Sequence, residues 1–343
     1  MRHYEGVQDQ EKRVGQLLAG PRGRELCARL AGVPAWDVHD EDASVVVSRL
    51  LSGEPGEDVV PDLNGDDPLA AVPVLGEIAE QVSYWGDYTA ADPLEEPAVL
   101  AVIRAQAEMV AGAGGCQWWW SALDRDAQVY VQWTGRAESA PALEPAYAAA
   151  MLREVARRAA ETEQSMDSDR HKPAGSGVNG SWWSHPWPGA FSTTRHLGRL
   201  GSLLLAGYED GFGDTEAVIW PLAVADGARV WEIDTPAAWQ DLVSAYPRPA
   251  TATYRHTWAW TGWDGEWLTP DWPAVANDWD GVHLTVAGYL GAAGRALPVA
   301  SARTMLAGWN PDETYWLADV ITPSGEPQRW RTKDGDPLAW DRY

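Results

Sequence analysis

The densest group of side chains able to do chemistry lies in SWWSHPWPGAFSTTRHLG, residues 181–198. It combines the indoles of Trp182 and Trp183 with the imidazole of His185 and the guanidinium of Arg195. Indole faces bind flat rings and cations, and a guanidinium can hold a carboxylate or phosphate through two parallel hydrogen bonds. We therefore expect these four residues to bind a ligand. The alternative interpretation is an ordinary surface loop punctuated by proline and glycine, which would have the same composition.

A second group of indoles, CQWWWS, spans residues 116–121. If this stretch is extended, Trp118 and Trp120 share one face and Trp119 takes the other, because side chains alternate along a strand. One face would belong to the core, and the other would meet a second layer, a subunit or a ligand. Only two phenylalanines occur against 22 tryptophans, so most indoles are expected in the core. Trp118, Trp119 and Trp120 are nevertheless further candidates for ligand binding.

Proton transfer is suggested by WDGVHLTVAGYL, residues 279–290, in which Asp280 and His283 form a D-x-x-H pattern. The stretch resembles the C-terminal block of the SGNH esterases. The resemblance implies that Asp280 and His283 would serve a catalytic serine. That family carries a G-D-S block, which this chain lacks. A strand with a turn at Asp280 and a hydrogen-bonded core histidine is the alternative.

Glu232 is the third candidate for acid–base chemistry, because it lies in VWEID, a predicted strand. The stretch S-T-T-R, residues 192–195, resembles the S-T-S strand of arginine-type ADP-ribosyltransferases. The resemblance would make Glu232 the acid that such enzymes place on a later strand. That family has an E-x-E or Q-x-E pattern downstream of this strand, and no such pattern follows residue 195 here.

No cofactor is indicated by the sequence, and the cofactor therefore stays unknown. Neither G-x-x-x-x-G-K-[ST] nor a strand-linked G-x-G-x-x-G occurs, and H-E-x-x-H is absent. The turn GYEDGFGD could offer Glu209, Asp210 and Asp214 to a divalent cation, but it lacks EF-hand spacing and an ordinary hairpin turn is expected. We predict no metal site.

The net charge of −24 bears on partners. A surface of this sign repels nucleic acids and anionic membranes, so neither is an expected partner, while a protein partner stays open. No window of about 18 apolar residues predicts a membrane span, and the polar N-terminus does not look like a secretory signal. Two thiols, Cys27 and Cys116, fit a reducing compartment, so we expect a cytoplasmic protein. Abundant arginine and alanine are typical of a GC-rich genome, such as an actinobacterial one.

Composition divides the chain into two predicted regions, residues 1–112 and 113–343. The first 110 residues carry 21 Asp and Glu against 8 Lys and Arg, and hold only two of the 22 tryptophans. Their apolar residues recur at helical spacing, which predicts an acidic helical region. Helices are expected over residues 7–18, 25–30, 68–82 and 97–110.

The second region is predicted to be a Trp-rich, mostly antiparallel sheet with helices packed on one side, which makes the whole chain α+β. Helices are expected at 144–161 and, after the N-cap Thr235, at 236–245, with a weaker one at 271–278. Residues 165–181 lack large apolar side chains and predict a flexible loop or linker. Strands are expected at 128–133, 202–208, 217–222, 229–233, 251–257, 282–286, 304–308 and 314–320.

The function that these features favour is binding of a small, ring-bearing and, given Arg195, anionic ligand in a Trp-lined pocket. His283 with Asp280 or Glu232 would then transfer protons, which would make the protein an enzyme. The competing interpretation is a non-enzymatic interaction module that presents an exposed tryptophan patch.

Overall fold

The computed structural model describes residues 2–33, 43–52, 61–63, 65–80, 93–134, 147–168, 172–173, 181–186, 190–209, 211, 213–333 and 336–343. Most of the predicted loop at 165–181 lies outside these ranges, as do Trp36, Trp85 and Trp187.

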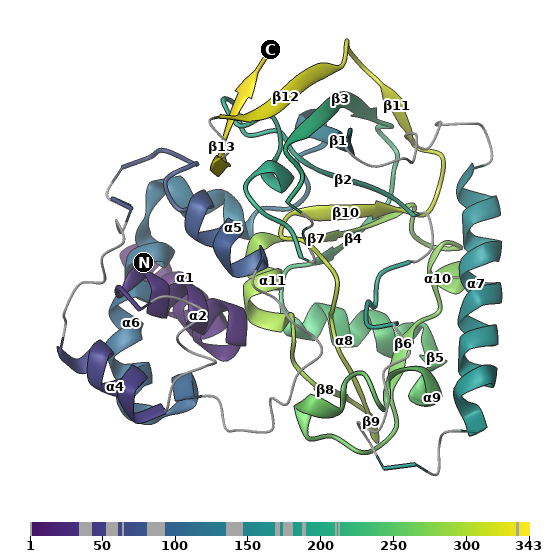
Figure 1. Cartoon of the computed structure of the whole chain (residues 1–343), viewed down its shortest axis with the longest axis horizontal. Coiled ribbons are helices and arrows are strands. Elements are labelled where there is room, and N and C mark those ends of the chain that lie inside the picture. Colours follow the sequence, from purple (N-terminus) through teal and green to yellow (C-terminus); the bar gives the residue numbers. More distant parts are fainter. Residues whose placement is uncertain are drawn as a thin grey trace.

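The N-terminal part is helical, as predicted, and its helices gather on one side of the molecule, to the left in Figure 1. Proline opens α2 and α6 at the first helical turn, where its missing N–H has no cost. The helix over residues 43–52 was not predicted. Within the described residues, the α-helices of this part are α1 (Arg2–Ala19), α2 (Pro21–Leu30), α4 (Ala43–Ser52), α5 (Val72–Glu80) and α6 (Pro97–Gly112).

A nine-stranded sheet forms the second part, with the order β13-β12-β3-β1-β2-β10-β7-β4 and β11 paired to β3. Every pairing is antiparallel except β4 with β7. The predicted α+β class with a mostly antiparallel, Trp-rich sheet is confirmed. The strands are β1 (Gln128–Trp133), β2 (Phe191–Arg195), β3 (Glu216–Val224), β4 (Val230–Ile233), β7 (Gly281–Leu284), β10 (Glu313–Trp316), β11 (Ile321–Pro323), β12 (Gln328–Lys333) and β13 (Asp336–Arg342).

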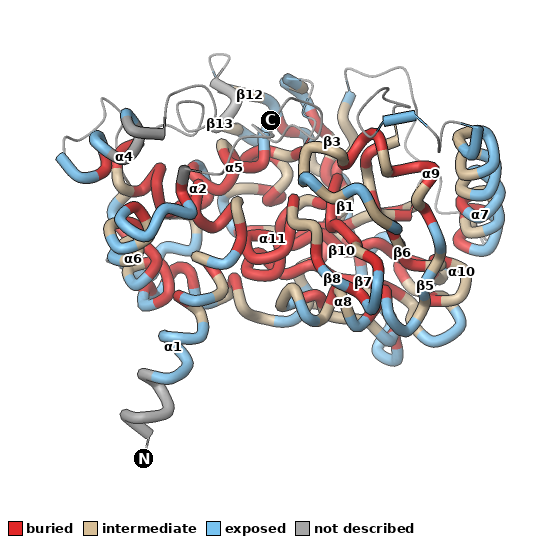
Figure 2. The backbone as a smooth tube through the Cα atoms, turned by 90° about the horizontal axis from the view of Figure 1, so that it is seen from below, coloured by how far each residue is buried: buried red, intermediate tan, exposed pale blue. Residues whose placement is uncertain are grey.

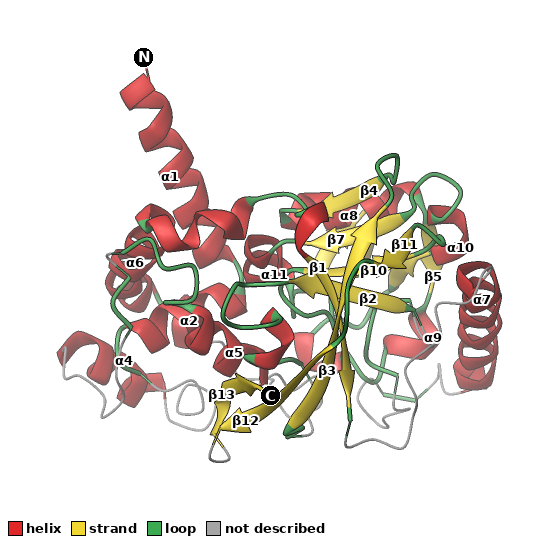
Figure 3. Ribbon diagram, turned by 90° about the horizontal axis from the view of Figure 1, so that it is seen from above, coloured by secondary structure: helices red, strands yellow, loops and turns green. Residues whose placement is uncertain are grey.

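Smaller elements surround the sheet, and the long helix α7 (Tyr147–Met166) stands at the edge opposite the N-terminal helices (Figures 1 and 3). Only Ala148, Met151 and Val155 of α7 are buried, so its second half is largely exposed (Figure 2). The others are α8 (Pro236–Ala245), α9 (Thr251–Tyr254), α10 (Trp272–Val275), α11 (Val286–Ala292) and two ribbons, β5 (Pro247–Pro249) with β6 (Leu268–Pro270) and β8 (Leu297–Val299) with β9 (Ala302–Thr304).

The main core is continuous between the two compositional regions. One buried cluster includes Leu17 and Leu26 of the N-terminal helices together with Ile233 and Leu290. Gln16 also donates a hydrogen bond to the carbonyl of Asp234 at 2.6 Å. The division at residue 112 therefore stays a prediction about composition.

Several predicted strands are wrong. Residues 116–120 lie in the 3-10 helix η2 (Gly114–Trp120), so this stretch is not extended and the conditional alternation argument for the three indoles does not apply. Residues 203–205 form another 3-10 turn, η5 (Leu203–Leu205), instead of a strand. Residues 251–254 are helical, and residues 304–308 contribute only the end of β9.

No single helix in the described ranges is both long and apolar enough to cross a membrane. The pair α6 and η2 reaches the required length and composition together but is bent by 88°.

Candidate functional site

The residues predicted to form one site lie in two separate places. Arg195, His283, Glu232 and Trp118 meet in a polar network at the sheet. Trp183 and His185 line a cavity beside α7.

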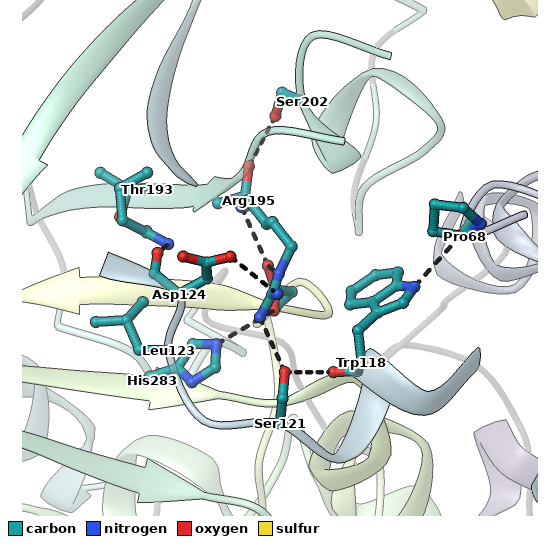
Figure 4. A network of polar contacts seen from close by, with 12 residues as sticks. Pro68, Trp118, Ser121, Leu123, Asp124, Thr193, Arg195, Ser202 and His283 are labelled. Atoms are coloured by element: carbon teal, nitrogen blue, oxygen red, sulfur yellow. Dashed lines mark hydrogen bonds and ion pairs between the residues drawn. The ribbon is translucent and has the colours of Figure 1, made fainter. Parts of the chain in front are cut away.

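Arg195, the last residue of β2, is the centre of the network and is 8 % exposed. Its partner is Asp312, which is 2 % exposed and adopts a left-handed backbone with φ of 58°. Asp312 accepts hydrogen bonds from the Arg195 backbone N–H at 3.1 Å and from Nε at 3.4 Å. The guanidinium also reaches Ser121 Oγ at 3.1 Å and Asp124 Oδ2 at 3.5 Å (Figure 4). The sequence did not single out Asp312, because its contact with Arg195 spans 117 residues.

His283 is fully buried in β7 with a carboxylate on each ring nitrogen. Nδ1 lies 2.6 Å from Glu232 Oε2, which the parallel pairing of β4 and β7 places directly alongside, and Nε2 lies 3.4 Å from Asp312 Oδ1. Burial lowers the pKa of His283, but the hydrogen bonds and charges of Asp312 and Glu232 outweigh it and raise the pKa to about 9. A protonated imidazole with both nitrogens occupied has no lone pair to accept a proton, so this geometry favours a structural ion network.

Asp280 does not join His283. Asp280 lies just before β7, where it accepts the Arg229 backbone N–H at 2.7 Å and lies 3.5 Å from Nε of the same residue. The hydrogen bonds of these two side chains therefore give no support to the D-x-x-H pairing that the SGNH resemblance implies.

Arginines of the chain itself cover the half-buried indoles of residues 116–121, Trp118 and Trp120. The guanidinium of Arg195 lies 5.2 Å from the Trp118 ring centre, and that of Arg13 lies 4.7 Å from the Trp120 ring centre. Trp119 is fully buried. These cation–π contacts occupy ring faces that a ligand would need.

The hydroxyls of β2 are also engaged internally. Thr193 Oγ1 donates to Gln128 at 2.6 Å and accepts from the indole of Trp316 at 2.9 Å, and Thr194 Oγ1 lies 2.7 Å from Ser202 Oγ. The strand that resembles the S-T-S motif is thus a buried central strand between β1 and β10.

A cavity of about 810 Å³ lies between α7 and the elements α9, α10 and β5. This volume is within the range of about 300–1,000 Å³ that small-molecule sites occupy. Aromatic side chains from three parts of the chain line it, and charged residues from α7 and β5 complete the wall. The aromatic residues are Trp183, His185, Tyr254 and Trp272.

The segment that carries Trp183 is fixed by hydrogen bonds on both sides. The hydroxyl of Tyr254 donates to the Trp183 carbonyl at 2.7 Å, and the indole of Trp258 donates to the Trp182 carbonyl at 2.9 Å. The Ser184 N–H donates to the Ala307 carbonyl at 2.8 Å. Trp182 itself is buried in the neighbouring aromatic cluster, so only Trp183 of this pair lines the cavity. Such a fixed backbone pre-organises the ring of Trp183.

Gly308 allows the approach of this segment to the loop before β10. It has φ of 75°, and a Cβ at this position would lie 2.7 Å from Trp183 Cβ. The position therefore requires glycine both for its backbone and for space.

His185 serves as an uncharged aromatic wall. Its ring stacks on Tyr315 with centres 4.7 Å apart and an interplanar angle of 7°, and it lies 6.3 Å from the ring of Trp183. Burial lowers its pKa to about 3, although a backbone hydrogen bond at Pro186 opposes the shift. At neutral pH the imidazole is therefore neutral and offers ring surface rather than charge.

Sequence reasoning missed most of the cavity. The sequence predicts a weak helix at Trp272 and a strand at Tyr254, and the periodicity of residues 144–161 predicts a helix without indicating that it lines a cavity. The remaining charged lining residues are Arg158, Glu163, Asp167, Arg248 and Asp271. Helical and strand periodicity show which residues are buried, but not which distant elements meet.

Among the described residues, no group of three or more His, Cys, Asp or Glu side chains is arranged to hold a metal ion. In the acidic turn, Glu209 accepts the Gly308 N–H at 2.9 Å, Asp214 accepts the Tyr208 hydroxyl, and Asp210 lies outside the described residues.

No protein-family model, curated protein or solved structure matches the chain. The geometry of the polar network and of the cavity is therefore the basis for the proposed function.

Proposed function

We propose that the protein binds a small organic ligand with a flat ring in the cavity between α7 and the elements α9, α10 and β5. The observation that carries this proposal is the wall of four aromatic side chains, Trp183, His185, Tyr254 and Trp272, around a cavity of about 810 Å³.

The contrast with the indoles of residues 116–121 supports the choice of this cavity. Trp118 and Trp120 are covered by arginines of the chain, and Arg195 is balanced by Asp312. In the cavity, by comparison, the half-buried rings of Trp183 and His185 border open volume beside the nearly buried Tyr254 and Trp272, and polar groups of the wall can orient a ligand.

Proton transfer by His283 has weaker support, because both ring nitrogens already contact carboxylates. We therefore propose a binding function first and keep catalysis as a secondary hypothesis. The interaction-module alternative also has weaker support: the exposed large apolar residues among those described are Val45, Leu51 and Tyr343, and none is a tryptophan. A cytoplasmic location is part of the proposal, since both cysteines are free thiols in the structure.

The test is calorimetric titration with flat-ring probes: indole, phenol, adenosine and glucose. The wild-type protein is expected to bind at least one of them, and Trp183→Ala is expected to weaken that binding about tenfold or more through the loss of one stacking face.

Trp118→Ala is the matched control, since it removes a half-buried indole from the other group. It is expected to leave ring binding unchanged. If Trp118→Ala weakens binding and Trp183→Ala does not, the ligand occupies the network region and the proposal is wrong.

A further inference from the structure

Two opposite charges face the cavity from one side of a short ribbon. In the β5–β6 ribbon Arg248 pairs with Thr269, and the Asp271 N–H extends the ladder by donating to the Tyr246 carbonyl at 2.8 Å. Residues that alternate by two along a strand share a face, so Arg248 and Asp271 are diagonal neighbours on the same face. Diagonal neighbours of this kind lie about 7–8 Å apart. Both line the cavity.

These two charges are not paired with each other or with any other charged side chain that the structure describes. The Arg248 guanidinium donates to the hydroxyl of Thr269 at 2.7 Å, which leaves its charge without a carboxylate. Asp271 stands at the N-cap position of α10, but its side chain accepts no capping hydrogen bond. Half-buried charges of opposite sign that stay apart can each bind the complementary charge of a ligand.

The other charged groups of the wall are already engaged. Glu163 accepts the backbone N–H groups of Ala252 and Thr253 at 2.9 and 2.8 Å, and also the Thr253 hydroxyl. Arg158 forms an ion pair with Glu154 at 2.7 Å. Arg248 and Asp271 are therefore the charges most open to a ligand.

We infer that the ligand is a zwitterion of the α-amino acid type with a ring-bearing side chain. Its carboxylate would bind the guanidinium of Arg248, its ammonium group would bind the carboxylate of Asp271, and its ring would lie against the aromatic wall at Trp183 and Trp272. This inference rests on the proposed function and adds the chemical class of the ligand. Single-charge relatives of such a ligand would satisfy only one of the two residues.

The experiment compares four probes that share a phenyl ring: L-phenylalanine, phenethylamine, 3-phenylpropionate and the uncharged 2-phenylethanol. Calorimetry on the full-length protein is expected to rank L-phenylalanine first, about tenfold or more above each single-charge probe, because charged hydrogen bonds are the stronger kind. Indole and adenosine serve as ring probes without this zwitterionic group.

Two substitutions separate the charges. Arg248→Gln is expected to weaken L-phenylalanine and 3-phenylpropionate about tenfold while leaving phenethylamine unchanged, and Asp271→Asn is expected to do the reverse. Arg158→Gln, in an exposed residue of the same wall, is the control and should leave all affinities unchanged.

The outcomes distinguish the two proposals. Equal affinity for the four phenyl probes overturns the zwitterion inference but leaves the ring-binding function supported. Binding of indole or adenosine without binding of any phenyl probe has the same two consequences. If no ring probe of either set binds, both proposals are wrong. A loss of phenethylamine affinity in Arg248→Gln would also contradict the assigned roles.

Discussion

The network around Arg195 and the cavity beside α7 contain the same kinds of side chain, but these side chains differ in how far they contact partners within the chain. In the network, the cations Arg195 and His283 lie against Asp312 and Glu232, and the indoles are covered by arginines. In the cavity, Trp183 and Trp272 border open volume, and Arg248 and Asp271 remain apart. Residue type alone therefore does not identify a binding site. A site needs aromatic and charged groups that border open volume, whereas groups enclosed in a buried ion network stabilise the fold.

The largest predicted effect falls on the network. Asp312→Asn keeps the shape of the side chain, and asparagine also tolerates a left-handed backbone. The substitution removes the negative charge between Arg195 and His283. We expect a loss of about 3–5 kcal/mol in the free energy of unfolding, because a buried cation loses its partner. Urea denaturation measures it.

Asp124→Asn is the control for that substitution. Its carboxylate is 44 % exposed and lies 3.5 Å from Arg195, so we expect a change of less than about 1 kcal/mol. If both variants lose a similar free energy of unfolding, burial of the Asp312 carboxylate contributes little to stability.

The next effect is a dependence on pH. The folded pKa of His283 is raised from 6.5 to about 9, so its stabilisation is fully present below about pH 6.5 and is lost as the pH rises through 9. At 1.36 kcal/mol per pKa unit, the loss is up to about 3 kcal/mol. We expect the stability difference between wild type and His283→Gln to shrink over this window. A difference that stays constant with pH would contradict a charged imidazole.

Gly308 offers a prediction about the wall of the cavity. In Gly308→Ala the new Cβ would crowd Trp183, and φ of 75° is unfavourable for alanine, so we expect a loss of about 1–3 kcal/mol together with weaker ring binding. Gly262→Ala is a close control, because Gly262 has φ of 73° and nothing lies within 4 Å of its added Cβ. Equal effects of the two variants on stability and binding would show that the contact with Trp183 is unimportant.

The smallest effect is expected at the contact that joins α7 to α9. Glu163→Gln weakens the acceptor for two backbone N–H groups of α9. We expect a loss of about 1 kcal/mol in the free energy of unfolding, the usual cost of removing a helix-capping side chain. Faster hydrogen exchange at Ala252 and Thr253 would report it. Glu161→Gln, which removes an exposed i,i+4 partner of Arg157, should leave these amides unchanged.

Local signals in the sequence predicted local structure well. Thr235 followed by Pro236 predicted the start of α8, and the Thr235 hydroxyl does accept the Ala238 N–H. Alternation predicted β1 at residues 128–133 without error.

The wrong predictions depend on distant partners. The β-branched stretch from Thr251 predicted a strand, but Glu163, about 90 residues earlier, caps it as a helix. The indoles at 118–120 follow Gly115, where an added Cβ would lie 2.2 Å from the Asp67 carbonyl, so tertiary packing sets the backbone there. The network and the cavity are likewise formed by residues that lie tens of positions apart in the sequence, and periodicity cannot reveal such contacts.

Nuclear magnetic resonance of the tryptophan indole N–H groups tests the central claim most directly. Assigned indole signals would be followed while the flat-ring probe that binds best is added to the protein. We predict that the signals of Trp183 and Trp272 shift in proportion to occupancy, while those of Trp118 and Trp120 stay in place. Shifts confined to Trp118 and Trp120 would contradict the assignment of the cavity as the binding site.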